Sequence, residues 1–175
     1  MGTKRIGLAR MEALVENLKR EINLGAGTKL VGQRNKVESV TANDTLTAAE
    51  SGTTYIFADA AAVLTLPDSG SGDIIGVTYR FISNFQGTGQ KVVCSDTSNE
   101  DMIGALMAVD NDDSNATKAW PSLVATGNAS INITSVAQGH PGSQWIVTNI
   151  AADVWLVEGV MIQSGGSEVT PFATS

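Results

Sequence analysis

The single histidine and the single cysteine of this sequence are its clearest candidates for nucleophilic or acid–base chemistry. A Ser-His-Asp triad or a histidine metal site would depend on His140 alone, and its surroundings, GHPGS, are typical of a solvated loop. Cys94, in KVVCS, lies in a predicted strand, where a free cysteine is commonly a small buried hydrophobe. A lone cysteine also excludes an internal disulfide and a multi-cysteine zinc site. We therefore expect neither side chain to be reactive.

The stretch DNDDSN could bind a metal ion through its carboxylates. Asp110, Asp112 and Ser114 alternate as they do at the start of a calcium-binding loop, but the expected sixth-position Gly is Asn115 and the expected twelfth-position Glu is Pro121. An acidic solvated loop is therefore the preferred interpretation, and a looser surface calcium site is the alternative. We therefore predict no metal site, no cofactor and no catalytic residue.

Enzymatic function is not favoured by the remaining motifs. No Gly-x-Ser-x-Gly elbow, P-loop or Gly-x-Gly-x-x-Gly motif before a helix is present. The carboxylates are scattered through turns, so the sequence places no pair as general acid and base. We expect the chain not to be an enzyme, and a small glycan hydrolase is the enzymatic alternative.

The elements that would position these residues are mainly strands. Charged residues make up 17% of the chain and 18 residues are glycine, which favours a β-rich protein with many turns. From residue 37 the hydrophobic pattern has a period of two, which is typical of half-buried strands. The predicted strands are TTYIFA, AVLTL, IIGVTYRFI, KVVCS, SINITSV, SQWIVTNI and VWLVEGVMI.

Turn-forming residues separate these strands at a spacing typical of a sandwich or barrel. The predicted fold is therefore mainly β, with a β-sandwich or jelly-roll-like body over residues 37–163 and a C-terminal tail over residues 164–175. The segment 97–125 shows no clear period, and we expect it to contain a helical turn or a long loop.

The last predicted hairpin has two apolar faces. If AAD at 151–153 is its loop, one face carries Trp145, Val147, Trp155, Val157 and Met161, and the other carries Ile146, Ile150, Val154, Leu156, Val160 and Ile162. A sheet of a sandwich needs only one apolar face. We therefore expect the second face to be covered by the N-terminal arm or by another subunit.

Residues 1–36 are predicted to form a helical docking arm. Apolar residues follow one another at intervals of three and four, which is the pattern of a coiled-coil stripe: Leu8, Met11, Val15, Leu18 and Ile22. Such a short helix is marginal alone, so its stripe must pack on its own domain, on other copies or on another protein. The partner-binding residues are predicted to be this stripe together with Lys4, Arg5 and Arg10, which would steer the arm.

Charge is divided along the chain. Residues 1–38 hold eight Lys and Arg against four Glu, a net charge of +4, whereas residues 39–175 hold three against 14 acids, a net charge of −11. A basic arm on an acidic body suits an acidic partner surface. We expect no nucleic-acid partner, because the arm has no aromatic residues for base stacking.

No run of apolar residues approaches the ~18 that a membrane span needs, and Arg10 and Glu12 interrupt the apolar core that a signal peptide requires. We therefore expect no membrane partner, and synthesis in a cytoplasm.

Two parts of the sequence resemble virion proteins of tailed bacteriophages. The first is LTAAESGTTYIFADAAAVLTLPDSGSGDIIGVTYRFI, with Tyr55, Phe57, Arg80 and Phe81, and the second is SQWIVTNIAADVWLVEG, with Trp145 and Trp155. The likeness covers residues 43–85 and 143–159. The opening MGTKRIGLARMEALVENLKREI is similar to the start of small virion proteins of marine phages.

The resemblance implies a structural function. Its first implication is a head decoration, or cement, protein that is a homotrimer on the capsid surface, with the major capsid protein as partner. The alternative implication is a tail fibre, knob or receptor-binding protein, whose acidic loops at 68–73 and 110–115 would meet a host glycan or protein.

Overall fold

A computed structural model describes residues 34–112, 117–123, 127–134, 138–164 and 168–174. The chain divides into two units at residue 34, and the fold below is that of the second unit, Asn35–Ser175. The predicted arm residues Lys4, Arg5, Leu8, Arg10, Met11, Val15, Leu18 and Ile22 lie outside the described residues.

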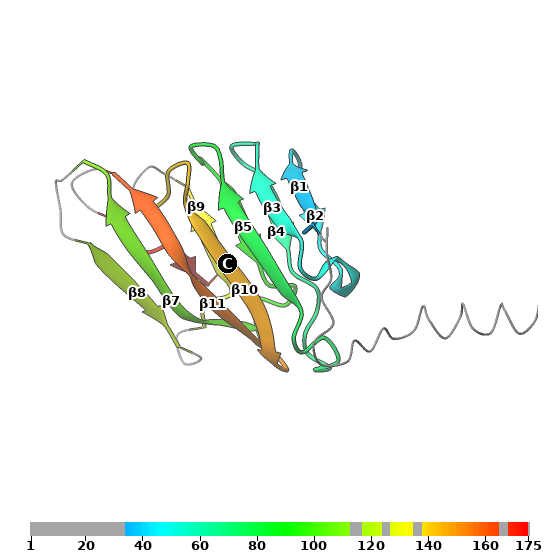
Figure 1. Ribbon diagram of the computed structural model, residues 1–175. Helices are drawn as coiled ribbons and strands as arrows, with labels where there is room; N and C mark the ends of the chain where they lie inside the picture. The colour runs from blue at the N-terminus through cyan, green and yellow to red at the C-terminus, as the bar shows by residue number, and fades with distance from the viewer. Residues whose placement is uncertain (1–33, 113–116, 124–126, 135–137, 165–167, 175) are drawn as a thin grey trace, which may run out of the picture. The chain divides into compact units, whose positions relative to one another are not determined.

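The described residues form two mixed β-sheets (Figure 1). The seven-stranded sheet has the order β1 (Val37–Val40), β3 (Thr54–Phe57), β5 (Thr78–Ser83), β10 (Gln144–Ala151), β11 (Val154–Gln163), β7 (Asp101–Asp110) and β8 (Lys118–Ser122). The five-stranded sheet has the order β12 (Phe172–Ala173), β9 (Ser130–Ile133), β6 (Gln90–Val93), β4 (Val63–Thr65) and β2 (Asp44–Thr45). A short 3₁₀-helix, η1, spans Ala48–Glu50.

The first six strands alternate between the two sheets. β1, β3 and β5 pair in parallel in one sheet, and β2, β4 and β6 pair in parallel in the other. The chain therefore crosses from one sheet to the other at each of these connections. Each successive pair, β1 with β2, β3 with β4 and β5 with β6, adds one strand to each sheet beside the previous pair. The later strands add antiparallel pairs, β5–β10, β10–β11, β7–β8, β6–β9 and β9–β12.

One hydrophobic core joins the two sheets. Aromatic rings fill its seven-stranded side: Tyr55, Phe57, Tyr79, Phe81, Trp145 and Trp155 are each at most 1% exposed. Neighbouring rings are in contact, for example Phe81 and Trp145 with centroids 5.6 Å apart. The five-stranded sheet contributes aliphatic side chains such as Leu64, Val92 and Ile131. Aromatic pairs of this kind stabilise a core beyond the area they bury.

The mainly β body is confirmed, and the structure corrects the sequence-based description in two segments. Residues 97–125 begin with one hydrogen-bonded turn, in which the Glu100 N–H donates to the Asp96 carbonyl at 2.9 Å. The rest of their described part is not mainly loop, as expected, but contains the ten-residue strand β7 and the strand β8. Part of the expected tail, 164–175, belongs to the body, because β12 pairs with β9 and Phe172 is 7% exposed. The parallel pairs also distinguish these sheets from the antiparallel sheets of a jelly roll.

The edge strands of both sheets carry features that discourage further strand pairing. Edge strand β1 carries the charged Glu38, and β8 contains Pro121, which has no N–H to donate. The other two edge strands, β2 and β12, are two residues long. Short strands, inward charges and prolines are known ways to protect a sheet edge from another chain.

Candidate protein-binding surface

The face of the seven-stranded sheet that points away from the core is apolar. We call it the outer face. Its strands alternate between buried and accessible residues, and many of the accessible positions hold large apolar side chains. They are Ile56, Ile82, Ile103, Met107, Val109, Ile146, Ile150, Val154, Leu156, Val160 and Ile162.

The two-faced hairpin predicted from the sequence is confirmed. Trp145, Val147, Trp155, Val157 and Met161 lie in the core, at most 1% exposed. On the outer face Ile146 is 37% exposed, Ile150 is 42% exposed and Val160 is 36% exposed. The loop is shorter than expected, because Ala151 pairs with Val154, and Asp153 has a left-handed φ of 59°. A bulge between Asn149 and Ala151 compensates for the shorter loop, so that the side chains of both strands stay on the faces predicted from the sequence.

Cross-strand neighbours make the outer face continuous. Ile56 lies opposite Ile82, Ile82 opposite Gln144, Gln144 opposite Val160, and Val160 opposite Met107. This row therefore crosses five strands with one uncharged polar side chain. Monomeric proteins rarely expose large contiguous apolar patches, and such patches commonly mark interaction sites.

The next row across the sheet holds one basic and one acidic residue. Arg80 in β5 and Glu158 in β11 both lie opposite Ile146 in β10, one on each side. Arg80 donates a hydrogen bond to Oε1 of Gln144. A hollow of about 380 Å³ lies here, lined by both charged residues, Ile146 and Val160. The described outer face can therefore receive both an apolar side chain and two opposite charges.

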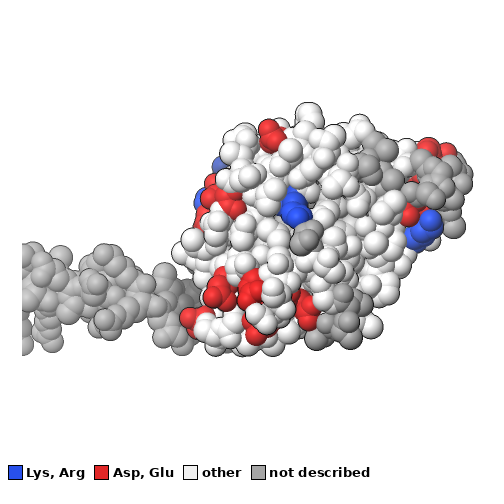
Figure 2. All heavy atoms as spheres, turned by 180° about the vertical axis from the view of Figure 1, so that it is seen from behind, with Lys and Arg blue, Asp and Glu red and all other residues white. Residues whose placement is uncertain are grey.

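The five-stranded sheet does not present a comparable surface. The outward positions of its central strands hold a mixture of polar and apolar side chains: Val63, Thr65, Lys91, Val93 and Asn132. Figure 2 shows the molecule from behind, where Lys and Arg are sparse and the acidic residues lie mainly towards the margins. A broad apolar surface is thus specific to the seven-stranded sheet among the described residues.

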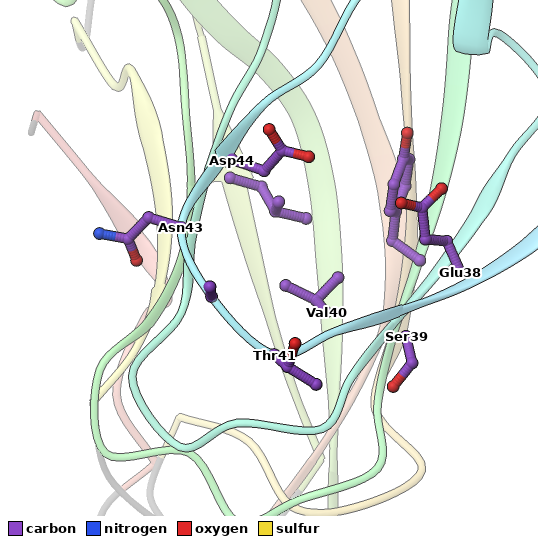
Figure 3. Close-up of a pocket in the computed structure, with 9 residues that line it drawn as sticks. Glu38, Ser39, Val40, Thr41, Asn43 and Asp44 are labelled. Atoms are coloured by element: carbon purple, nitrogen blue, oxygen red, sulfur yellow. The ribbon is translucent and has the colours of Figure 1, made fainter.

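A smaller cavity of about 170 Å³ lies at the bend between β1 and β2 (Figure 3). Glu38 and Asp44 come from the two strands, and Val40, Tyr55 and Leu64 form apolar parts of its wall. Burial and the neighbouring carboxylates of Glu50 and Glu38 raise the pKa of the Tyr55 phenol, so this hydroxyl stays neutral. Lys36 Nζ lies 2.7 Å from Glu38, which neutralises that carboxylate. We therefore interpret the cavity as the end of a sheet that charged side chains protect.

Glu100 is a functional-looking carboxylate that sequence analysis missed. It is 1% exposed and accepts four hydrogen bonds, from the N–H and hydroxyl of Ser69, the hydroxyl of Ser95 and the N–H of Asp96. Burial alone would raise the pKa of Glu100, but these hydrogen bonds together hold it below its usual value. No signal in the sequence distinguishes Glu100 from the exposed acids around it. All four donors belong to turns, so the residue is a structural anchor.

Cys94 and His140, the two candidates for chemistry from the sequence, both lie in structural positions. Cys94 is 2% exposed, and burial, with smaller contributions from Glu100 and Asp101, raises the pKa of its thiol. A thiol held neutral in this way is a poor nucleophile. His140 is half-buried, and its backbone N–H donates to the Ile162 carbonyl at 2.6 Å, which ties its loop to β11.

The described part of the acidic stretch shows no metal-binding cluster. The Asp112 N–H donates to Oδ1 of Asp110 at 3.1 Å, and Ser164 donates to Oδ2 of Asp112 at 3.2 Å. Ser114 lies outside the described residues. Across the residues that the structure does describe, no three His, Cys, Asp or Glu side chains come together in a way that could hold a metal ion.

Comparison with known proteins finds no matching family model, no matching curated protein and no matching solved structure. Among the described residues, no helix has the length and apolar character needed to cross a membrane.

Proposed function

We propose that the chain is a structural, non-enzymatic protein of a phage particle, which decorates and stabilises the outer capsid shell. The observation that carries the proposal is the outer face: a continuous apolar surface on a folded body suits binding to protein. The sequence resemblance supplies the finer statement, a β-sandwich body on the capsid surface with the major capsid protein as partner. The homotrimer stays a prediction from that resemblance.

Stabilisation follows from binding alone. A protein that binds only the assembled shell shifts the assembly equilibrium towards the shell by mass action. Several copies bound at neighbouring sites add their contacts through multivalency, so that each contact can be weak. In this proposal the arm docks on the shell through Leu8, Met11, Val15, Leu18 and Ile22, and the basic residues at its start steer it.

The arm can be tested in the full-length chain by co-sedimentation with particles that lack the protein. We expect Leu18→Glu, which places a charge in the predicted stripe, to reduce binding by about tenfold or more, since an unpaired charge in a protein interface is costly. Lys91→Glu, on the outward side of β6, is the control and should bind as the wild type does. Binding of the Leu18→Glu variant at wild-type strength would remove the arm from the mechanism.

The location on the particle distinguishes decoration from the tail alternative. A decoration protein should be spread in many copies over the shell, and gold-labelled antibody should mark the whole head. Labelling confined to the tail would contradict the proposal and support a receptor-binding function.

A further inference from the structure

The outer face is almost balanced in charge although the molecule is acidic. The chain has a net charge of −7, and the exposed charged side chains near the middle of this face are Arg80 and Glu158. They flank Ile146, one on either side of β10. No ion pair joins Arg80 or Glu158 to another described residue, so both charges are available to a partner.

The position of β10 gives this arrangement a symmetry. β10 is the fourth of seven strands, with β5, β3 and β1 on one side and β11, β7 and β8 on the other (Figure 1). A twofold axis parallel to β10, lying just above Ile146, exchanges the two sides of the sheet. It therefore places β5 of one copy over β11 of the other, and β3 over β7.

We propose that a second copy of this chain covers the outer face, about a twofold axis parallel to β10. The inference deepens the proposed function, on which it rests for the need to cover this face with protein. It proposes a dimer in place of the homotrimer that the sequence resemblance implies. In this arrangement Arg80 of each copy faces Glu158 of the other, and two equivalent ion pairs form. Sheets packed face to face lie about 10 Å apart, a gap that these two long side chains can span.

The apolar residues match under the same operation. Ile82 of one copy faces Val160 of the other, and Ile56 faces Met107, because each pair holds equivalent positions on either side of β10. Gln144 faces its own equivalent at the axis, where two amides can hydrogen-bond to each other. A twofold interface has to be self-complementary in this way.

Other ways of pairing two copies are less favourable. A twofold axis perpendicular to the strands would place Arg80 over Arg80 and Glu158 over Glu158, and like charges in apposition are destabilising. Edge-to-edge pairing is opposed by Glu38 in β1, by Pro121 in β8 and by the two-residue length of β2 and β12.

Charge reversal tests the pairing in the full chain by sedimentation velocity over a range of micromolar concentrations. The wild type should be a dimer at the upper end of the range. Arg80→Glu and Glu158→Arg should each weaken association by about tenfold or more, since each creates two like-charge contacts. The double variant R80E/E158R should recover most of the wild-type association, because the ion pairs are re-formed with reversed sense.

Two controls keep the test specific. Lys91→Glu changes charge by the same amount as Arg80→Glu on the other sheet and should leave association unchanged. Circular dichroism should show the same β content in all variants.

Each result has a stated consequence. A monomeric wild type, a closed trimer, or a dimer that neither single reversal weakens would overturn the inference. Failure of the double reversal to restore association would also overturn it. A dimer that responds as expected but does not bind capsids would contradict the proposed function and leave the inference standing.

Discussion

Glu100 joins two turns that are distant in the sequence. Its Oε1 accepts from the N–H of Ser69 at 2.7 Å, and its Oε2 accepts from the N–H of Asp96 at 2.8 Å. The turn around Ser69 also reaches the β10–β11 loop, because the Asp153 N–H donates to the Ser69 carbonyl at 3.3 Å. A buried acceptor that satisfies several backbone donors is costly to lose.

We expect Glu100→Gln to lower the free energy of unfolding at neutral pH by about 2 to 4 kcal/mol, because an amide has one acceptor oxygen and leaves donors unpaired. Urea unfolding followed by tryptophan fluorescence measures the change. Asp44→Asn is the control: Asp44 is exposed, and its Oδ1 acceptor for the Thr45 N–H survives in the amide. A loss in Glu100→Gln no greater than that in the control would contradict the anchoring function.

The same residue makes stability depend on pH. Because the folded state lowers the pKa of Glu100 below its ordinary value of 4.5, the contribution is complete above that value and is lost as pH falls through the lower folded-state pKa. The difference in stability between the wild type and Glu100→Gln should therefore shrink on acidification. A constant difference across this range would contradict the assignment.

The longest parallel pair, β7 with β11, depends on a glycine. Gly104 lies opposite Val157 and has a φ of 126°, in the region that favours glycine. A Cβ at this position would lie 2.1 Å from the Val157 carbonyl oxygen, which is part of the backbone and cannot turn away. β7 can therefore reach its full ten-residue pairing with β11 only with glycine here.

We expect Gly104→Ala to lower the free energy of unfolding by more than about 3 kcal/mol, since it combines backbone strain with a steric overlap. Gly52→Ala is the matched control, because Gly52 has a φ of 84° but a Cβ added there would meet no atom within 4 Å. Strain alone should cost that variant about 1 kcal/mol. Thermal unfolding of the two purified variants compares them, and equal losses would show that the overlap is relieved.

The whole chain combines a basic N-terminal segment with an acidic β body. Eight of its 11 Lys and Arg residues fall in residues 1–38. The three in the body, Arg80, Lys91 and Lys118, all lie within strands: β5, β6 and β8. Hydrogen-bonded strands resist proteases because cleavage requires local unfolding.

Limited trypsin digestion should therefore leave the body intact. We expect mass spectrometry to find a stable product that begins after Arg34 or Lys36 and includes the three body residues uncut. The same chain in denaturant-unfolded form, digested after dilution, is the control and should be cut at all three. Early cleavage of the native chain after Arg80 or Lys91 would show that the body is less stable than its core implies.

The strands of the body could largely be predicted, since period-two alternation is a local property of the sequence. Tyr55 and Phe57, Tyr79 and Phe81, and Trp145 and Val147 all face the core as their alternation indicates. β7 escaped prediction because Gly104 interrupts its inward row and because Met102 and Ile103 make both of its faces apolar. Such a pattern has no contrast between faces from which a period could be read.

Local patterning by itself determined that the chain forms a β-rich body and that its last hairpin has two apolar faces. Only the tertiary structure decided which strands are neighbours, and hence that β10 lies at the centre with Arg80 and Glu158 on either side of Ile146. Strand order and parallel pairing depend on contacts between residues far apart in the chain, which side-chain alternation does not specify. For the same reason the anchor made by Glu100 with Ser69 became visible only in the folded protein.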